Sequence, residues 1–206
     1  MNCHYATRFM TPTGKQLDQT KAYNSSSDIS STGGQMSRLL GLAYASKLYQ
    51  QDKNLQSQRG SSLFSKKGNE VAFGTIGNAS TSEGVFWETI NAAGVLQVPM
   101  ALSIWDDDYG ISVPSKYQTT KESIFEILQG FQWNKKQGGI DLYQVKGYDY
   151  EDLIATYKTA IAKCRKHHVP CIIHVSHMTQ PQGHSTSGSH ERYKSTARLK
   201  YEEEID

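Results

Sequence analysis

Short apolar segments that alternate with helical patterns are the feature that most limits the folds open to this chain. Residues 71–76 (VAFGTI) and 100–104 (MALSI) carry no charge, as expected for strands covered on both faces. Residues 140–145 and 170–175 are also expected to be strands. Helices between such strands imply βαβ crossovers, so we expect an α/β fold with a mainly parallel sheet and helices on both of its faces.

Apolar residues that recur with helical spacing predict the helices between these strands. Such spacing occurs over residues 35–50, from about 82 onward, over 122–128 and 153–166, and again from 196. Thr81 or Ser82 is expected to cap the second helix, with Glu83 in its first turn. Asp149 and Asp152 resemble a capping box ahead of the helix at 153–166.

Length and composition limit the class of protein. The 206 residues suit a single domain, and 22 basic residues against 20 acidic ones give no reason to expect nucleic-acid binding. No apolar run reaches the ~18 residues that cross a bilayer, and the N-terminus has no secretory pattern. Cys3, Cys164 and Cys171 lack metal-ligand spacing. We expect the last two to be buried and reduced, so a cytoplasmic location is the simplest prediction.

Several segments are expected to lie outside the regular α/β core. Only 37% of the residues are hydrophobic, which is low for a self-sufficient domain. We therefore interpret residues 1–206 as one domain from a longer subunit. Residues 1–29 have weak periodicity and are expected to be irregular, and the polar residues 51–67 are expected to form an exposed connection. Residues 176–195 make a long polar loop, which is typical of functional or disordered loops.

Two polar segments follow two of the predicted strands. The small-residue turn GNASTSEG occupies residues 77–84, and the acidic segment WDDDYG occupies residues 105–110. Ligands of an open parallel sheet bind beyond the carboxyl ends of its strands, so both segments are expected at the binding edge. Gly77 and Ala79 lack bulk, and the helix that follows adds its N-terminal field. This combination favours the binding of a diphosphate group.

A diphosphate group needs a cation that offsets its charge. Mg²⁺ prefers hard oxygen ligands in octahedral geometry. Asn78 can provide an amide oxygen, Asp107 a carboxylate oxygen and Tyr109 a backbone carbonyl oxygen. The alternative is an ordinary strand-to-helix turn beside an acidic surface loop. Because both segments are expected on one edge of the sheet, we favour the metal–diphosphate site.

The same segments carry a resemblance to a known family. They resemble the thiamine-diphosphate motif, which runs Gly-Asp-Gly, a spacer and then Asn-Asn. Residues 77–84, WETINAA at 87–93 and DYGISVP at 108–114 are similar to the α subunit, or the α half of a fused chain, of the decarboxylating component of 2-oxo acid dehydrogenase complexes. The segments QMSRLLGLAYASK at 35–47 and GHSTS at 183–187 extend the similarity.

The resemblance implies a cofactor site built around thiamine diphosphate and Mg²⁺. The backbone of three residues would bind the diphosphate: Gly77, Ala79 and Ser80. Three residues would bind the metal: Asn78, Asp107 and Tyr109, the last through its carbonyl. Glu83 would sit behind the diphosphate region.

The resemblance also implies residues for the other end of the cofactor. Ile111 would face the aminopyrimidine ring, with Ser30 and Thr32 near the same end. His184, in the active-site loop at 176–195, would reach the reacting end of the cofactor or its diphosphate, and it is the catalytic candidate.

In this family, thiamine diphosphate attacks a 2-oxo acid, CO₂ leaves, and the acyl group passes to a lipoyl group on another subunit. The resemblance therefore implies a β subunit or β half, a lipoyl-bearing acyltransferase and a 2-oxo acid as partners, in a homo-oligomer or a heterotetramer. The Glu that activates the aminopyrimidine lies on the β side, so we expect the isolated fragment to be inactive. Branched-chain acids are the first expectation for the substrate, and pyruvate is the second.

The chain departs from the family pattern at the predicted metal site. Asn78 stands where the family has Asp, and Asp107 stands where it has the second Asn. We expect Mg²⁺ binding to persist, because both side chains still present oxygen. Ala79 replaces a Gly, and Thr179 with Gln180 replaces a Tyr-Arg pair that includes a diphosphate-binding cation. Two alternatives stay open: a degenerate member that retains the fold for assembly only, and another thiamine-diphosphate enzyme of the transketolase type.

Overall fold

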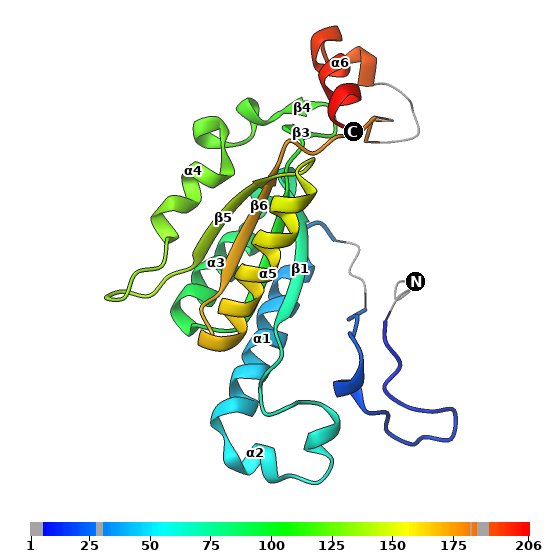
Figure 1. The fold of residues 1–206 in the computed structure, drawn as a ribbon, viewed down its shortest axis with the longest axis vertical. Helices are drawn as coiled ribbons and strands as arrows, with labels where there is room; N and C mark the ends of the chain where they lie inside the picture. The colour runs from blue at the N-terminus through cyan, green and yellow to red at the C-terminus, as the bar shows by residue number, and fades with distance from the viewer. Residues whose placement is uncertain (1–5, 28–30, 182, 185–189) are drawn as a thin grey trace.

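A four-stranded parallel sheet forms the centre of the molecule (Figure 1). The structure, a computed structural model, describes residues 6–27, 31–181, 183–184 and 190–206. The sheet has the order β1-β2-β6-β5, and its strands are β1 (Ala72–Gly77), β2 (Met100–Trp105), β5 (Asp141–Lys146) and β6 (Cys171–Ser176). Every neighbouring pair is parallel, with Gly77 opposite Trp105 and Trp105 opposite Val175. The predicted α/β fold with a mainly parallel sheet is confirmed.

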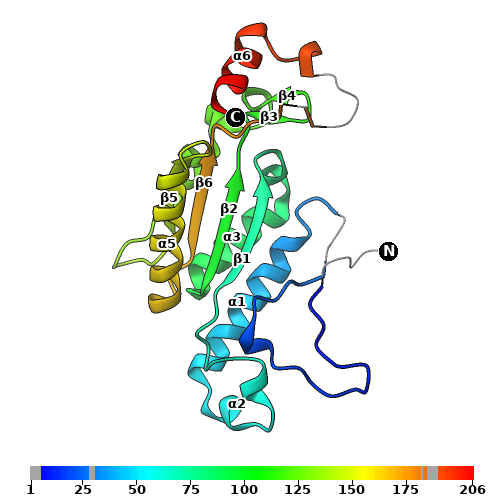
Figure 2. The same ribbon diagram turned by 45° about the vertical axis from the view of Figure 1, so that its right-hand side comes forward.

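Helices cover the two faces of the sheet (Figure 2). The helices of the described residues are α1 (Gln35–Gln51), α2 (Lys53–Ser57), α3 (Gly84–Leu96), α4 (Ile124–Leu128), α5 (Tyr150–His167) and α6 (Thr196–Ile205). Of these, α2 and α6 lie beyond the ends of the sheet rather than on its faces (Figures 1 and 2). On one face, Met36 of α1, Phe86 and Ile90 of α3 and Leu128 of α4 are fully buried in one apolar cluster with Leu102 of β2. On the other face, α5 packs over the sheet through a second cluster that includes Ala160 and Cys164.

The expectation that residues 71–76 are covered on both faces is wrong for one face of β1. This strand lies at an edge of the sheet, and α5 packs across β5 and β6 rather than over β1. Phe73 is consequently 50% exposed, although its ring lies 6.1 Å from that of Tyr157 on α5. The uncharged sequence of β1 was therefore not sufficient evidence for burial on both sides.

Local hydrogen bonds shift several predicted helix boundaries. Residues Ala79–Ser82 form a 3₁₀ turn, and α3 begins only at Gly84, so that Glu83 is its N-cap residue. Neither Thr81 nor Ser82 caps this helix, because the Thr81 hydroxyl donates instead to the carbonyl of Asn78 at 2.6 Å. The predicted cap of α5 is confirmed, with Asp149 accepting from the amide of Asp152 at 3.0 Å.

The segments predicted to be irregular contain short elements. Residues 51–67 include α2 and a 3₁₀ turn at Ser61–Leu63, and the loop at 176–195 includes a 3₁₀ turn at His190–Arg192. The other 3₁₀ turns are Gln19–Lys21, Ser115–Tyr117, Thr120–Glu122 and Gln129–Phe131. Cys164 and Cys171 are free and buried, as predicted. Among the described residues, no helix is both long and apolar enough to span a membrane.

The carboxyl ends of the four strands meet at one end of the sheet. A small hairpin of β3 (Tyr109–Gly110) and β4 (Val113–Pro114) lies beyond this edge, together with α6 at the end of the chain (Figures 1 and 2). This hairpin was not predicted. It carries the residues that follow the acidic segment, so the edge expected to bind ligands is covered by parts of the chain far apart in sequence.

Candidate functional site at the carboxyl edge of the sheet

The turn after β1 is fixed by backbone bonds to the neighbouring strand. The amide of Asn78 donates to the carbonyl of Trp105 at 3.0 Å, which extends the ladder between β1 and β2 by one residue. The chain then turns through the 3₁₀ segment Ala79–Ser82, whose amides lie just ahead of α3. Asn78 is 6% exposed, so its side chain is held within the edge of the sheet rather than in bulk solvent.

The acidic segment after β2 folds into a loop, residues 106–110, here called the aspartate loop. Two of its carboxylates accept amide hydrogens from residues two positions later: Asp106 from Asp108 at 2.9 Å and Asp107 from Tyr109 at 3.1 Å. Such bonds are typical of Asp in tight turns. Asp108 takes a left-handed backbone with φ of 69°, which Asp tolerates better than most residues.

Two contacts join the turn after β1 to the aspartate loop. The side-chain amide of Asn78 donates to the hydroxyl of Ser115 at 3.3 Å, and the amide of Ser115 donates to the carbonyl of Asp108 at 2.8 Å. Gly110 also packs directly against the turn, since a Cβ atom at this position would lie 2.8 Å from the Cβ atom of Ala79. The structure thus brings these two predicted segments together.

Asp107 is a buried carboxylate beside this junction. Loss of hydration raises the pKa of Asp107 above its ordinary value, while the Tyr109 amide and the nearby Lys194 oppose that increase. Among the described residues, no Lys or Arg forms an ion pair with this carboxylate. The arrangement leaves a desolvated negative charge without a bonded counter-ion.

The aspartate loop contacts β6 through Asp106. His174 Nε2 lies 2.8 Å from Asp106 Oδ2, and Gln144 Nε2 lies 3.3 Å from His174 Nδ1. The ring of Phe125 stacks on His174 with 5.8 Å between centroids. This buried pair was not predicted, because its members lie 68 residues apart in the sequence.

The aspartate loop also contacts α6, through Arg198. Arg198 donates to the Asp107 carbonyl at 2.8 Å and to the Asp108 carboxylate at 2.6 Å. Its guanidinium also lies over the ring of Tyr109, 5.6 Å from the centroid. These contacts were not predicted either. The spacing of Arg198 and Glu202 on a helix could have suggested their mutual ion pair, but not the attachment to the loop.

Three further predicted residues lie around this edge. Gly33 packs against the start of α3, where a Cβ atom would lie 3.3 Å from Glu83 Cβ, so the neighbouring Thr32 lies near Glu83. Thr32 and Glu83 are both exposed. Ile111 is 61% exposed and has a left-handed backbone with φ of 58°. Ser30 lies outside the described residues.

The segment that carries His184 approaches the aspartate loop through an aromatic contact. A Cβ atom at Gly183 would lie 3.2 Å from the Cβ atom of His190 and 3.5 Å from the hydroxyl of Tyr193. The ring of Tyr193 in turn lies 5.6 Å from that of Tyr109. His184 itself is exposed. The segment is therefore adjacent to the aspartate loop, and the role of His184 stays a prediction.

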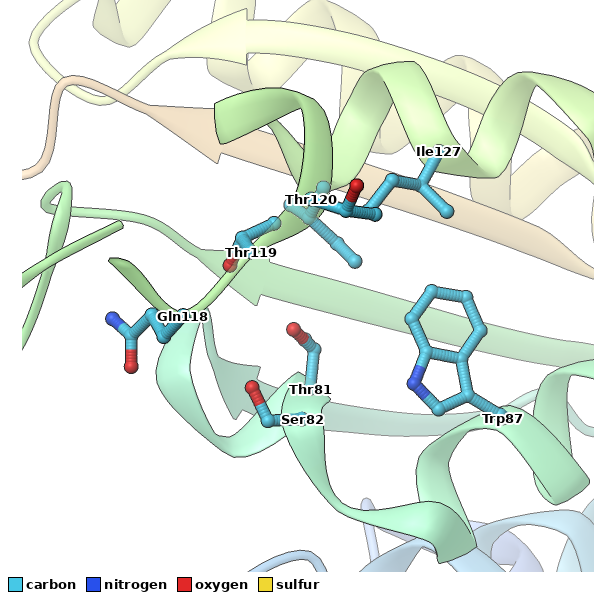
Figure 3. A pocket seen from close by; sticks show the side chains of 8 residues that line it. Thr81, Ser82, Trp87, Gln118, Thr119, Thr120 and Ile127 are labelled. Carbon is cyan, nitrogen blue, oxygen red and sulfur yellow. The ribbon is translucent and has the colours of Figure 1, made fainter. Parts of the chain in front are cut away.

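A pocket of about 300 Å³ lies beside the 3₁₀ turn after β1. Figure 3 shows Thr81, Ser82 and Trp87 along one wall and Thr119, Thr120 and Ile127 along the other. None of its lining side chains carries a charge, so the pocket by itself offers no counter-ion for a phosphate. The described residues also contain no cluster of three or more His, Cys, Asp or Glu side chains that could hold a metal. A metal here would depend on amide and carbonyl oxygens as well.

The order of the strands and the polar junction at their carboxyl ends define a parallel α/β protein of the kind that binds ligands at this edge. Residues 10–205 match the family described as dehydrogenase E1 component, and the chain belongs to that family.

Two named relatives illustrate the range of this family. The chain is 29% identical over 141 residues to the pyruvate dehydrogenase E1 component subunit alpha of Acholeplasma laidlawii. It is 30% identical over 137 residues to the 3-methyl-2-oxobutanoate dehydrogenase subunit alpha of Mycobacterium tuberculosis. These alignments cover 68% and 66% of this chain, but only 34% and 33% of the relatives. The chain therefore spans about a third of the length of these relatives.

Proposed function

We propose that this chain forms the diphosphate- and Mg²⁺-binding part of a thiamine-diphosphate-dependent 2-oxo acid dehydrogenase. The observation that carries the proposal is the junction of the two polar segments. Ala79 packs on Gly110, and Ser115 connects the Asn78 side chain to the Asp108 backbone. Asn78, Asp107 and the Tyr109 carbonyl are the proposed metal ligands at this junction.

The chemistry of these groups fits a magnesium ion. The side-chain nitrogen of Asn78 donates a hydrogen bond to the Ser115 hydroxyl, and no described residue donates to the side-chain oxygen of Asn78. The carboxylate of Asp107 accepts one amide hydrogen from Tyr109, and its burial raises its pKa. A divalent cation would supply the missing positive charge and would lower that pKa again. One carboxylate and neutral oxygens suit Mg²⁺, which usually keeps water and phosphate oxygens among its ligands.

The remaining residues would bind and orient the cofactor. The backbone of Gly77, Ala79 and Ser80, together with the N-terminal field of α3, would receive the diphosphate. Glu83 would lie behind it, Thr32 and Ile111 would lie toward the aminopyrimidine, and Ser30 would lie near the same end. His184 would hold a proton or a phosphate oxygen near the reacting end. When bound, thiamine diphosphate supplies the carbanion chemistry of decarboxylation.

The proposal includes partners that complete the active site. A β subunit or β half would supply the group that activates the cofactor, and a lipoyl-bearing acyltransferase would receive the acyl group. The relatives are named for pyruvate and for 3-methyl-2-oxobutanoate, so a 2-oxo acid with a short aliphatic side chain is the proposed substrate class. We expect the 206-residue chain alone to show no decarboxylation, and turnover by this chain alone would contradict the need for a partner.

The experiment that tests the metal site exploits the exchanged Asn and Asp. Calorimetric titration with thiamine diphosphate, with and without Mg²⁺ and with the β partner present, compares four proteins: the wild type, Asp107→Asn, Asn78→Asp, and the double variant. We expect Mg²⁺-dependent binding by the wild type and a loss of about tenfold or more in Asp107→Asn, which has no carboxylate ligand. Because the double variant moves the carboxylate to the other ligand position, it should bind about as well as the wild type.

Two results would reject parts of this proposal. If Asp107→Asn binds as tightly as the wild type, Asp107 is not a ligand. If neither the wild type nor Asn78→Asp shows Mg²⁺-dependent binding, the chain is a family member that retains the fold for assembly without the cofactor. The circular dichroism of all four proteins provides the folding control.

A further inference from the structure

The end of the described chain closes over the aspartate loop. Beyond its bonds to Asp107 and Asp108, Arg198 donates to Glu202 Oε1 at 2.6 Å. Glu202 also accepts from Lys194 at 2.7 Å, and these two side chains are 3% and 1% exposed. Burial alone would lower the pKa of Arg198, but its bonds to Asp108 and Glu202 raise that pKa above the ordinary value. Arg198 is therefore a permanently charged link between α6 and the loop.

Arg198 acts on the backbone of the loop as well as on its charges. Arg198 donates to the carbonyl of Asp107, which belongs to the peptide group before Asp108. The amide of Ser115 donates to the carbonyl of Asp108, which belongs to the peptide group after it. The left-handed φ of Asp108 lies between these two fixed peptide groups. A residue other than Gly adopts this left-handed conformation only at a cost in free energy, so the loop would relax without such bonds.

The location of this constraint gives it a functional consequence. Asp108 is flanked by Asp107 and Tyr109, which are two of the three proposed metal ligands. A change in the Asp108 backbone would rotate the Asp107 carboxylate and the Tyr109 carbonyl relative to each other. Mg²⁺ demands near-ideal octahedral geometry, so its binding is sensitive to such a rotation.

We propose that Arg198 is a positioning residue for the metal site, and this inference rests on the proposed function. By holding the Asp107 carbonyl and the Asp108 carboxylate, Arg198 fixes the relative positions of Asp107 and Tyr109. The buried pair of Lys194 and Glu202 anchors α6, and Glu202 orients the guanidinium by accepting its Nε hydrogen. The ligand set at the carboxyl edge thus depends on a helix that contributes no ligand itself.

The test compares variants of Arg198 with a matched control on the same helix. Arg198→Gln removes the charge, and Arg198→Lys retains it but lacks the planar fork that reaches two acceptors at once. Lys200→Gln is the control, since Lys200 is exposed and, within the described part of the chain, pairs only with Glu204, at 3.9 Å. Asp108→Asn removes the partner charge and leaves α6 unchanged, which covers the case in which Arg198→Gln fails to fold.

Two measurements separate this inference from the proposed function. The first is hydrogen exchange of the Tyr109 and Ser115 amides in the metal-free chain, which reports the order of the loop directly. We expect Arg198→Gln and Asp108→Asn to accelerate this exchange by about tenfold, the effect of losing one charge-assisted bond. The second is the affinity for thiamine diphosphate with Mg²⁺, which should fall by about tenfold in Arg198→Gln and recover in part in Arg198→Lys.

Each outcome has a distinct meaning. Exchange and affinity within twofold of the wild type in both Arg198→Gln and Asp108→Asn would overturn the positioning role and leave the proposed function intact. Faster exchange with unchanged affinity would also overturn it, since the loop would then be ordered without consequence for the metal. A wild-type protein without Mg²⁺-dependent binding would overturn the proposed function, and the role of Arg198 with it. Equal effects in Lys200→Gln would show a general effect of charge instead.

Discussion

His174 and Asp106 form a buried bond of 2.8 Å that joins the middle of the sheet to the candidate site. His174 belongs to β6, whereas Asp106 is the first residue after β2. The amide of Asp106 also donates to the carbonyl of Val175, and its carbonyl accepts from the amide of Met178 at 3.0 Å. The loop that carries Asp107 therefore begins at a residue tied to β6 by both its backbone and its side chain.

We predict that His174→Phe destabilises the protein by about 3 kcal/mol. The ring shape is nearly retained, but the Asp106 carboxylate loses a bonded partner in a buried setting. Urea unfolding followed by circular dichroism measures the effect. His167→Phe provides the control, because His167 is an exposed residue near the opposite end of the sheet. A difference below about 0.5 kcal/mol between the two variants would show that the buried bond makes no net contribution to the free energy of unfolding.

The charge of Asp107 should make the metal-free protein less stable at neutral pH. Desolvation raises the pKa of Asp107 in the folded chain, so the folded state favours the protonated form. The stability that protonation provides is complete below the unfolded pKa of about 3.9 and is lost as the pH rises through the folded pKa. Asp107→Asn should therefore be more stable than the wild type at pH 7 without metal.

Urea unfolding over a pH series measures this difference, which should shrink as the pH falls through the raised pKa of Asp107. Added Mg²⁺ with thiamine diphosphate should stabilise the wild type far more than Asp107→Asn. A wild type that is the more stable of the two at pH 7 in the absence of metal would contradict the assignment of Asp107 as a desolvated carboxylate.

Single and double substitution of the buried pair Lys194 and Glu202 should differ in how much stability they remove. Glu202→Gln leaves the Lys194 charge without its partner and should cost about 3 kcal/mol. The double variant Lys194→Met, Glu202→Leu removes both charges of this pair, and Arg198 retains its bond to Asp108, so the double variant should lie closer to the wild type than Glu202→Gln does. Amide exchange in α6 and urea unfolding measure the change.

The pH dependence of this pair follows from the pKa of Glu202. Burial alone would raise this pKa, but bonds from Lys194 and Arg198 lower it below the ordinary value. The stability from the pair is therefore present above the unfolded pKa of about 4.3 and is lost as the pH falls through the lowered folded pKa. If Glu202→Gln differs from the wild type as much at pH 2 as at pH 7, the ionised Glu202 is not the origin of the effect.

Gly110→Ala should disturb the junction between the two polar segments. Its Cβ atom would lie 2.8 Å from Ala79 Cβ and 2.6 Å from Gln118 Oε1. The Gln118 side chain can rotate away, but Ala79 is fixed on its turn, so the loop must shift at a cost of about 1–3 kcal/mol. The double variant Gly110→Ala, Ala79→Gly removes the clash with the Ala79 Cβ atom and should recover most of that lost stability. Thermal unfolding of the three proteins decides whether this contact is as tight as described.

The sequence predicted the layers of this fold because each strand and helix carries its own periodic pattern. Residues 35–50 and 153–166 correspond to α1 and α5, and residues 100–104 and 170–175 correspond to β2 and β6, with boundaries that agree within three residues. The resemblance of residues 77–84 and 108–114 led to the E1 dehydrogenase family, which the family match over 10–205 confirms.

The exposure of β1 could not be predicted in the same way. Its six residues are uncharged, a pattern shared by buried strands and by edge strands with one open face. Only the path of α5 across β5 and β6 decides that Phe73 stays exposed. The start of α3 was misplaced for a similar reason, because the Thr81 hydroxyl found a nearer acceptor in the carbonyl of Asn78.

The sequence by itself determined a parallel α/β domain of a recognisable family, with polar residues at the carboxyl ends of two strands, because these properties depend on neighbours along the chain. The tertiary structure decided which groups surround those residues. His174 and Arg198 reach the aspartate loop from 68 and 90 residues away, at Asp106 and Asp108. Such contacts depend on how β6 and α6 pack across the sheet edge, and side-chain charge alone does not identify a partner at that separation.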